Sequence, residues 1–343
     1  MPKGLICAVV VAIGANAAIT AAGATAATLT GAGSTLVSPL AAEWAQGFDN
    51  STGSSVTYDP VGSGTGVSDA SSGTVDFGAS DLPLSSYSGE CGGCKQIPWA
   101  LSATGIAYDI PGISNNTNTQ AKDALKLTGA ILAKIYLGQI TTWNNPAIVK
   151  LNKGLALTSL KITPVWRADA CGDTYAFTNF LSDVSTAWSS SKKGYGATIS
   201  FSAGVGEVGL SGVAAKVGST PGAIGYLSAS YLLAQHVGTA AIQNAAGNYE
   251  YPRLNNIGNA AASVKSVPSS GLSIVAPPRS QKIAYPISAF TYAIIPATVT
   301  QPDTLENFLT YTITTGRQMG LGLDFEPIPS VVLSYDESVI SSL

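Results

Sequence analysis

Short β-type segments alternate with helical segments along this chain, and three of the strands end in a small, polar turn that leads into a helix. The turns are Gly33-Ser34-Thr35, Gly62-Ser63-Gly64 and Cys171-Gly172-Asp173. Strands that alternate with helices are typical of α/β proteins, in which helices cover a largely buried sheet. The sequence therefore predicts an α/β fold.

The hydrophobic pattern predicts where most elements lie. We expect strands at Leu29–Gly31, Val56–Tyr58, Val75–Ala79, Thr104–Ile110, Ile162–Trp166 and Tyr285–Ile295, and helices at Ala121–Tyr136, Thr174–Trp188 and Thr304–Gly316. A further helix is expected to begin at Ser38 and Pro39, a pair typical of an N-cap and the first helical position. In that helix Leu40, Trp44 and Phe48 recur at every fourth position and would form one apolar face.

The three turns share a chemistry that suits anions. Backbone N–H groups at a strand–turn–helix junction point outward without a partner and attract negative charge. A single turn of this kind is more often an ordinary loop. Three in one chain, one of them four residues beyond Arg167, predict a cleft that binds an oxyanion.

Composition excludes several classes of protein. The 343 residues include only 17 Lys and Arg and 20 Asp and Glu, so no basic stripe exists to bind a nucleic acid. Hydrophobic residues make up 45% of the chain, which is enough for a folded core and argues against disorder. Few charges would also suit a membrane protein, but only the N-terminus has an apolar run near the ~20 residues that a span needs.

The N-terminus has the pattern of an export signal. Lys3 supplies a positive charge, residues 5–13 are apolar, and Ala24-Thr25-Ala26 matches the small-x-small pattern of a cleavage site. We expect residues 1–27 to be a signal peptide, cleaved after residue 26 or 27, rather than an uncleaved anchor. The mature protein would then be exported, to the periplasm or to the cell surface.

Export makes the cysteines informative. Cys91 and Cys94 are separated by two glycines and predict a small disulfide in an oxidising compartment. A zinc site is the alternative, but it would need further ligands, and the only histidine, His236, lies far away in the sequence. The disulfide is the favoured interpretation, and it leaves Cys171 unpaired.

Seven segments carry a more specific signal. They are LTGAGSTLVSPL (29–40), GSGTG (62–66), VDFGASDLPLS (75–85), IYLGQITTWNNPAI (135–148), RADACGDTYAFTNFLSDVS (167–185), PGAIGY (221–226) and AYPIS (284–288). In this order they resemble the phosphate-binding proteins of bacterial phosphate ABC importers, over almost the whole mature chain. The resemblance implies a two-lobed type II periplasmic-binding-protein fold. Each lobe would be a mixed sheet flanked by helices, with the ligand in the cleft between the lobes.

The resemblance also implies a domain organisation and a function. Lobe 1 is expected at 28–101 plus 284–343 and lobe 2 at 102–283, with a hinge that closes the lobes on the ligand. The expected protein is an extracytoplasmic solute-binding protein that captures inorganic phosphate, with arsenate as a second candidate ligand. It would deliver phosphate to the membrane permease of an ABC importer. We expect a monomer that uses no cofactor and no metal.

Family positions in the first two turns imply donors to the phosphate. Thr35 would donate through its hydroxyl and its N–H, and Leu36 through its N–H alone. The family commonly has Phe where Leu36 stands, a difference without consequence if only the backbone contacts the ligand. Ser63 matches the serine of the second turn.

Three charged residues match the family's charged positions. Asp81 would accept a hydrogen bond from the protonated oxygen of phosphate, whereas fully deprotonated sulfate would leave that buried acceptor unpaired beside an anion. Arg167 would pair with the anion through its planar fork of donors. Asp169 would hold the arginine in place.

The third turn departs from the family's usual Ser-Gly-Thr. Cys171 replaces the serine, Gly172 is retained, and Asp173 replaces the threonine. Cys171 would contribute its backbone N–H, because a thiol is a weak donor. An ionised Asp173 would repel phosphate unless one of the two carries a proton. The favoured interpretation is that Asp173 caps the following helix, with Thr174 as a substitute donor. The alternative is direct contact with the anion.

Two other functions fit the same scaffold. One is a secreted phosphatase-like enzyme, and the other is a surface structural or adhesion protein with an idle site. The chain has a single histidine, no G-x-S-x-G turn and no His/Asp cluster spaced for two metals, so we expect it not to be an enzyme. The adhesion protein is disfavoured because Asp81 and Arg167 are both present.

Overall fold

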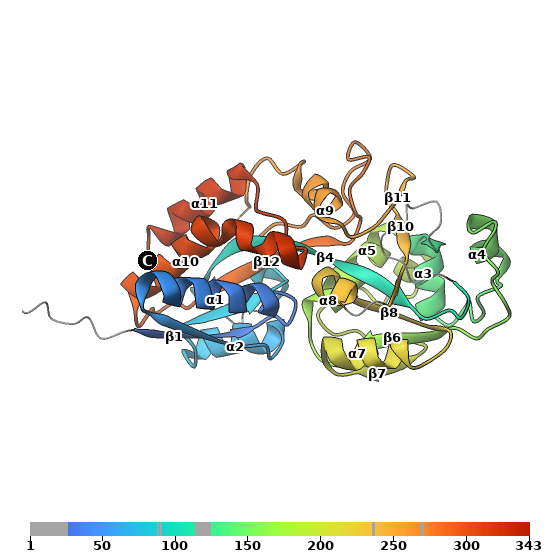
Figure 1. The fold of residues 1–343 in the computed structure, drawn as a ribbon, viewed down its shortest axis with the longest axis horizontal. Coiled ribbons are helices and arrows are strands. Elements are labelled where there is room, and N and C mark those ends of the chain that lie inside the picture. Colours follow the sequence, from blue (N-terminus) through green and yellow to red (C-terminus); the bar gives the residue numbers. More distant parts are fainter. Residues whose placement is uncertain (1–26, 88, 90, 114–124, 235–236, 269–270) are drawn as a thin grey trace, which may run out of the picture.

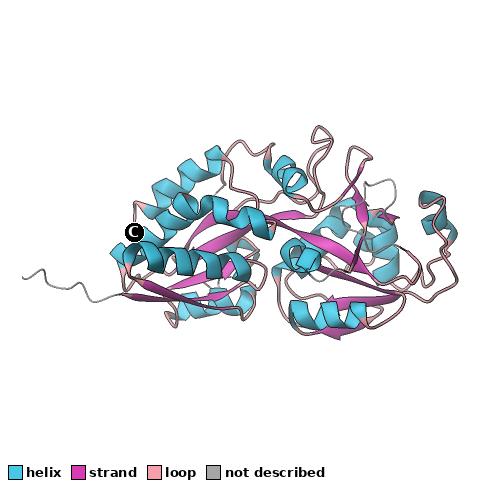
Figure 2. Ribbon diagram, in the orientation of Figure 1, coloured by secondary structure: helices cyan, strands magenta, loops and turns pink. Residues whose placement is uncertain are grey.

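The computed structural model describes residues 27–87, 89, 91–113, 125–234, 237–268 and 271–343. Residues 1–26 of the predicted signal peptide and His236 lie outside them. Figure 1 shows two lobes side by side: the blue and red parts of the chain form lobe 1, and the green and yellow parts form lobe 2. Helices lie around the strands of each lobe, as Figure 2 shows. The predicted two-lobed α/β fold is confirmed.

One mixed sheet runs through both lobes. Its strand order is β2 (Ser55–Asp59), β1 (Thr28–Gly33), β3 (Phe77–Ser80), β12 (Ser288–Ile295), β4 (Lys95–Tyr108), β8 (Ala223–Ser228), β6 (Thr163–Arg167) and β7 (Val205–Glu207), with β9 (Gly238–Thr239) paired to β4. A small second sheet contains β11 (Tyr249–Glu250), β10 (Ala241–Gln243) and β5 (Lys126–Leu127). β1 is parallel to β2 and β3, and β6 is parallel to β7 and β8. The predicted strands all lie within or overlap these elements.

The long strand β4 belongs to both lobes. It pairs with β12 over residues 95–103 and with β8 over residues 104–108, antiparallel in both cases. The sequence prediction of Thr104–Ile110 therefore covers only residues 104–108 of the strand. The predicted boundary between 101 and 102 falls inside this continuous strand, so the limits of the two lobes remain a prediction.

Lobe 1 is covered by helices on both sides of its strands. They are α1 (Ser38–Thr52), α2 (Ser63–Ser72), α10 (Pro302–Ile313), α11 (Ser330–Ile340) and the 3-10 segments η1 (Leu84–Ser86) and η3 (Thr315–Leu323). The apolar face predicted for α1 is confirmed, since Leu40, Trp44 and Phe48 are all buried. Trp44 packs against Trp99 of β4 with ring centroids 4.9 Å apart, which ties α1 to the strand that crosses between the lobes.

The prediction that Ser38 caps α1 is wrong. Ser38 is already helical, and Val37 occupies the N-cap without a side-chain hydrogen bond. The hydroxyl of Ser34 instead accepts from the N–H groups of Leu36 and Val37, at 3.1 and 3.2 Å. A buried hydroxyl upstream of the helix thus satisfies donors in this turn, and the cap position needs no polar side chain.

Seven helices lie between β4 and β12 in the sequence, among the described residues. They are α3 (Gly129–Tyr136), α4 (Pro146–Leu151), α5 (Gly172–Val184), α6 (Thr186–Ser190), α7 (Gly209–Gly218), α8 (Ala229–Ala234) and α9 (Leu254–Ala261). The helix predicted from Ala121 begins only at Gly129, because Thr128 caps it and β5 precedes it; residues 121–124 lie outside the described residues. The helix predicted over Thr174–Trp188 begins earlier and breaks at Ser185, whose side chain caps α6.

The structure joins Cys91 and Cys94 in a disulfide, with Cα atoms 5.4 Å apart, and leaves the buried Cys171 free. Within the described ranges, no group of three or more His, Cys, Asp or Glu side chains is placed to hold a metal ion. None of the helices in the same ranges combines the length and the apolar character that crossing a membrane requires.

A buried carboxyl group lies in α11, away from the turns. Asp336 is fully buried, and neither of its carboxylate oxygens has a hydrogen-bond partner among the described residues. Burial raises the pKa of Asp336 to about 9. The folded protein therefore keeps the proton at neutral pH, whereas an unfolded chain, with an ordinary pKa near ~3.9, releases it. This difference makes the free energy of unfolding fall as the pH rises from about 4 toward 9.

Replacing Asp336 by asparagine should remove this contribution. We expect the Asp336→Asn protein to lose less stability than the wild type between pH 5 and pH 8, by up to about 1.4 kcal/mol for each pH unit. Urea unfolding at several pH values measures how steeply the stability of each protein falls with pH. Asp49→Asn, at an exposed aspartate, is the matched control. An identical slope in the Asp336→Asn and wild-type proteins would show that this carboxyl does not titrate on unfolding.

Candidate functional site

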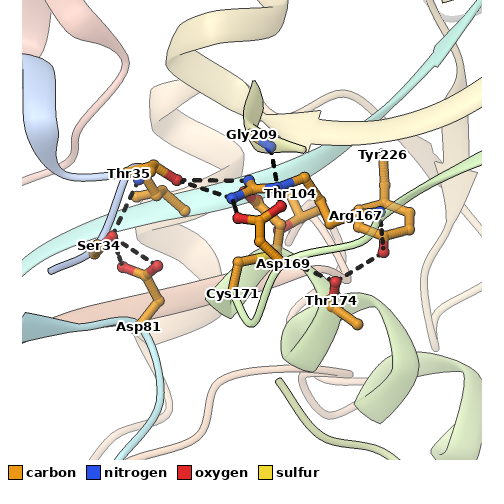
Figure 3. Close-up of polar contacts among 12 residues, drawn as sticks. Ser34, Thr35, Asp81, Thr104, Arg167, Asp169, Cys171, Thr174, Gly209 and Tyr226 are labelled. Carbon is orange, nitrogen blue, oxygen red and sulfur yellow. Dashed lines mark hydrogen bonds and ion pairs between the residues drawn. The ribbon is translucent and has the colours of Figure 1, made fainter. Parts of the chain in front are cut away.

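The predicted site residues come together where the two lobes meet. Ser34 and Thr35 follow β1, Asp81 follows β3, and Arg167 ends β6, so three carboxyl strand ends contribute. Ligands of open α/β sheets bind in the crevice at such strand ends. Figure 3 shows Ser34, Thr35 and Asp81 on one side, facing Arg167 and its partners on the other.

Lobe 1 contributes a buried carboxylate surrounded by hydroxyl groups. The hydroxyl of Ser34 donates to both oxygens of Asp81, at 2.6 and 2.7 Å, and the hydroxyl of Ser63 donates to one of them at 3.2 Å. Burial raises the pKa of Asp81, while these hydrogen bonds and the charge of Arg167 oppose the increase. Hydroxyl donors therefore hold Asp81 as a hydrogen-bond acceptor inside the protein.

Lobe 2 contributes a guanidinium group held by a carboxylate. The side chain of Arg167 is fully buried; its Nε donates to Asp169 at 2.8 Å, and its NH2 group forms a second, short bond to the same carboxylate. Asp169 also accepts from the N–H of Gly209 at 2.9 Å. Burial would raise the pKa of Asp169, but these hydrogen bonds hold it below its ordinary value. These contacts fix the arginine and Asp169 against each other; that Asp169 orients the arginine for a ligand stays a prediction.

The remaining edge of Arg167 faces lobe 1. Its two terminal nitrogens lie 3.5 and 3.4 Å from the hydroxyl of Thr35. Burial would lower the pKa of Arg167, but the hydrogen bonds and the neighbouring carboxylates raise it, so the charge is permanent. A fixed positive fork is thus directed at the junction between the lobes.

Asp173 does not cap α5, so the favoured interpretation of its side chain is wrong. The helix already begins at Gly172, and Cys171 is the N-cap. The Asp173 carboxylate instead accepts from the hydroxyl of Thr104 at 2.6 Å and lies 3.7 Å from NH1 of Arg167. Burial raises its pKa to about 7, although the charge of Arg167 opposes the increase. The Asp173 side chain points into the site because it accepts a hydrogen bond from Thr104 and pairs with the charge of Arg167.

Cys171 and Thr174 belong to a series of buried polar contacts that ends at the backbone N–H of Arg167. The Cys171 thiol lies 3.3 Å from the Thr174 hydroxyl, which in turn lies 2.8 Å from the hydroxyl of Tyr226. That hydroxyl accepts from the N–H of Arg167 at 3.0 Å. Burial raises the pKa of Cys171 to about 12, so the thiol keeps its proton. The backbone N–H of Cys171 donates to the carbonyl oxygen of Ala197 at 3.1 Å.

The lobes touch closely where α5 begins. A Cβ atom added to Gly172 would lie 2.1 Å from the Cβ of Asp81, far inside van der Waals contact. A Cβ atom added to Gly62 would lie 3.0 Å from the carbonyl oxygen of Ala170, and one added to Gly64 would lie 3.5 Å from the Cβ of Ala170. The second and third turns therefore both lie against residues of the opposite lobe, and at Gly172 a larger residue would clash with Asp81.

The structure brings together all the residues predicted for the site, and it adds two that the sequence analysis missed. Ser34 was noted only as part of a turn, although its position between Gly33 and Thr35 at a strand end was a signal. Thr104 lies inside β4, with no local pattern to mark it. The N–H of Leu36, expected to face a ligand, donates to Ser34 instead.

Comparisons with known proteins agree with this geometry. A family model described as a PBP superfamily domain matches residues 18–315. The phosphate-binding protein PstS of Xylella fastidiosa is 32% identical over 317 residues, which cover 92% of this chain and 85% of that protein. The phosphate-binding protein PstS3 of Mycobacterium bovis is 33% identical over 313 residues, with 85% and 80% covered. The chain belongs to the PstS phosphate-binding proteins of the PBP superfamily.

Solved structures share the fold. A substrate-binding protein of a putative phosphate ABC transporter from Clostridium perfringens, solved with bound phosphate, superposes with a TM-score of 0.62 at 18% identity. The match covers 88% of this chain and all of that one. The PstS family assignment thus agrees with the two-lobed arrangement observed here.

We predict that removing the arginine leaves buried carboxylates uncompensated. Arg167→Met should lower the free energy of unfolding by about 3–5 kcal/mol at pH 8. The loss should be smaller at pH 5, because Asp173 and Asp81, with raised pKa values, then take up protons more readily. Urea unfolding at pH 5 and pH 8 measures the two losses of stability. Arg279→Met, at an exposed arginine, is the control. Equal losses of stability at pH 5 and pH 8 would show that Asp81 and Asp173 do not become uncompensated charges when Arg167 is removed.

Proposed function

We propose that this protein binds inorganic phosphate reversibly at the junction of its lobes and delivers it to the membrane permease of an ABC importer. The observation that carries the proposal is the fully buried Arg167, with one edge held by Asp169 and the other directed at the hydroxyl of Thr35 in lobe 1. A planar fork of donors matches the oxygens of a tetrahedral anion. The names and bound ligand of the relatives support phosphate as that anion.

Each turn has a part in the proposed site. The hydroxyl of Thr35 donates to a phosphate oxygen, and so do the first N–H groups of α5 at Gly172 and Asp173, which lack partners within the helix. The hydroxyl of Ser63 would donate to phosphate in exchange for its bond to Asp81. The N–H groups of Leu36 and Cys171 would have to exchange the partners they have in this structure. We therefore assign them a smaller contribution.

Asp81 gives the proposed site its selectivity. Near neutral pH phosphate keeps a proton that can be donated to this carboxylate, whereas sulfate has none. With sulfate, two negatively charged oxygens would face each other in a buried site, at a cost of about 1–3 kcal/mol or more. Arsenate has the same shape and protons as phosphate, so we expect it to bind as well.

The rest of the proposal follows from the family. We infer that the mature protein is exported and acts as a monomer at the periplasm or cell surface. We also infer that it binds without turnover, since the site uses its polar groups to hold an anion. Neither the phosphatase-like enzyme nor the adhesion protein is favoured by a specific observation on the described residues.

Calorimetry with phosphate and sulfate tests the selectivity. The wild type should bind phosphate far more tightly than sulfate. Asp81→Asn should reduce this preference by roughly 5- to 150-fold, which corresponds to about 1–3 kcal/mol. Asp59→Asn, at the exposed last residue of β2, is the matched control and should retain the preference. Equal binding of both anions by the wild type, or an unchanged preference in Asp81→Asn, would overturn the role of Asp81.

Closure of the lobes has its own test. Gly172→Ala places a methyl group against Asp81, so the lobes cannot approach as they do here. We expect phosphate affinity to fall at least ~tenfold, or about 1.4 kcal/mol. Gly322→Ala, whose added Cβ meets nothing within 4 Å, should bind as the wild type does. Unchanged affinity in Gly172→Ala would show that phosphate binding does not need this contact.

A further inference from the structure

The site contains more negative charge than one arginine can balance. Three carboxylates, those of Asp81, Asp169 and Asp173, surround the single guanidinium of Arg167. If all three were ionised, the cluster would already be negative before a doubly charged anion entered. Like charges in a buried site raise one another's pKa until one of the groups takes up a proton.

We propose that Asp173 is a proton-linked specificity residue, which takes up a proton from solvent when phosphate binds and then donates a hydrogen bond to the anion. This inference rests on the proposed function of the site. The proton converts the Asp173 carboxylate to a neutral carboxylic acid, and no other bond is made or broken. Phosphate binding then strengthens as the pH falls.

The contacts of the three carboxylates explain why Asp173 is the one that takes up the proton. Asp169 is committed to two bonds from Arg167 and one from Gly209, all of which stabilise its charge. Burial raises the pKa of Asp81, but this carboxylate accepts from the hydroxyls of Ser34 and Ser63, and these hydrogen bonds oppose the increase.

Asp173 has weaker support for its charge. It has one hydrogen bond, from Thr104, and a longer ion pair of 3.7 Å. Its Oδ2, the oxygen opposite the Thr104 contact, lies toward the arginine and carries no described hydrogen bond. This oxygen is therefore placed to hold a proton beside an anion on Arg167.

Charged and titratable groups face Asp173 from every neighbouring element. Arg167 and Asp169 face it from the end of β6, and Asp81 from the end of β3. The Cys171 thiol, at the start of its own helix, keeps its proton. Thr104 of β4 is neutral. Only Arg167 favours the ionised form of Asp173 by its charge, and a phosphate bound to the free edge of that arginine would offset this effect.

The pKa of Asp173, raised by burial to about 7, agrees with this geometry. At pH 8 the free protein would be largely ionised at this position, and an arriving anion would raise the pKa further. Proton uptake on binding then makes the affinity fall up to ~tenfold for each pH unit above 7. A threonine at this position, as in the family's usual pattern, would lack this dependence.

The test is calorimetry of phosphate binding at pH 8 in buffers of different ionisation enthalpy, which counts the protons taken up. We expect close to one more proton in the wild type than in Asp173→Asn, whose amide resembles the protonated acid. At pH 8 the Asn variant should also bind phosphate ~tenfold more tightly than the wild type. Asp183→Asn, an exposed aspartate on the same helix, is the matched control and should take up protons as the wild type does.

Equal proton uptake in the wild type and in Asp173→Asn, or weaker binding by the Asn variant at every pH, would overturn the inference. Asp173→Thr serves as a second variant should Asp173→Asn fail to fold, with the same loss of one proton expected. If the wild type binds no phosphate between pH 5 and pH 9, the proposed function itself is contradicted. The two failures are therefore distinguishable.

Discussion

The arrangement of the site depends on one interaction, the bidentate bond between Arg167 and Asp169. A buried guanidinium is costly unless its donors are paired, and Asp169 pairs with one edge of the group. The other edge is thereby directed at Thr35 in the opposite lobe. Asp169 is itself fixed by the N–H of Gly209, so the orientation depends on α7 as well as on the third turn.

The fold places this pair where two lobes can close on it. β4 pairs with β12 in one lobe and with β8 in the other, and it carries Thr104 at the point where the partners change. The residue that holds Asp173 therefore lies on the strand that joins the lobes. Across the junction Gly172 lies against Asp81, so the buried carboxyl groups of Asp81 and Asp173 lie near each other. Their mutual repulsion makes the charge of the site sensitive to what binds there.

Much of this arrangement could be predicted from the sequence. The apolar spacing of Leu40, Trp44 and Phe48 predicted the buried face of α1, and the three turns predicted an anion site. Residues 95–103 of β4 and the break at Ser185 were missed, because the strand depends on tertiary pairing and the break depends on one cap. The orientation of Asp173 was also mispredicted, since it depends on Thr104, far away in the chain. Local patterns identified the loops, but long-range contacts determine what each side chain does.

The most direct measurement of the central claim is a crystal structure of the mature protein with phosphate. We predict an anion on the free edge of Arg167, with Asp169 still bonded to the other edge. One phosphate oxygen should lie ~2.5–2.7 Å from Asp81, the distance of a charge-assisted O–H···O⁻ bond. Phosphate bound elsewhere, or an Arg167 that leaves Asp169 to reach the anion, would contradict the account.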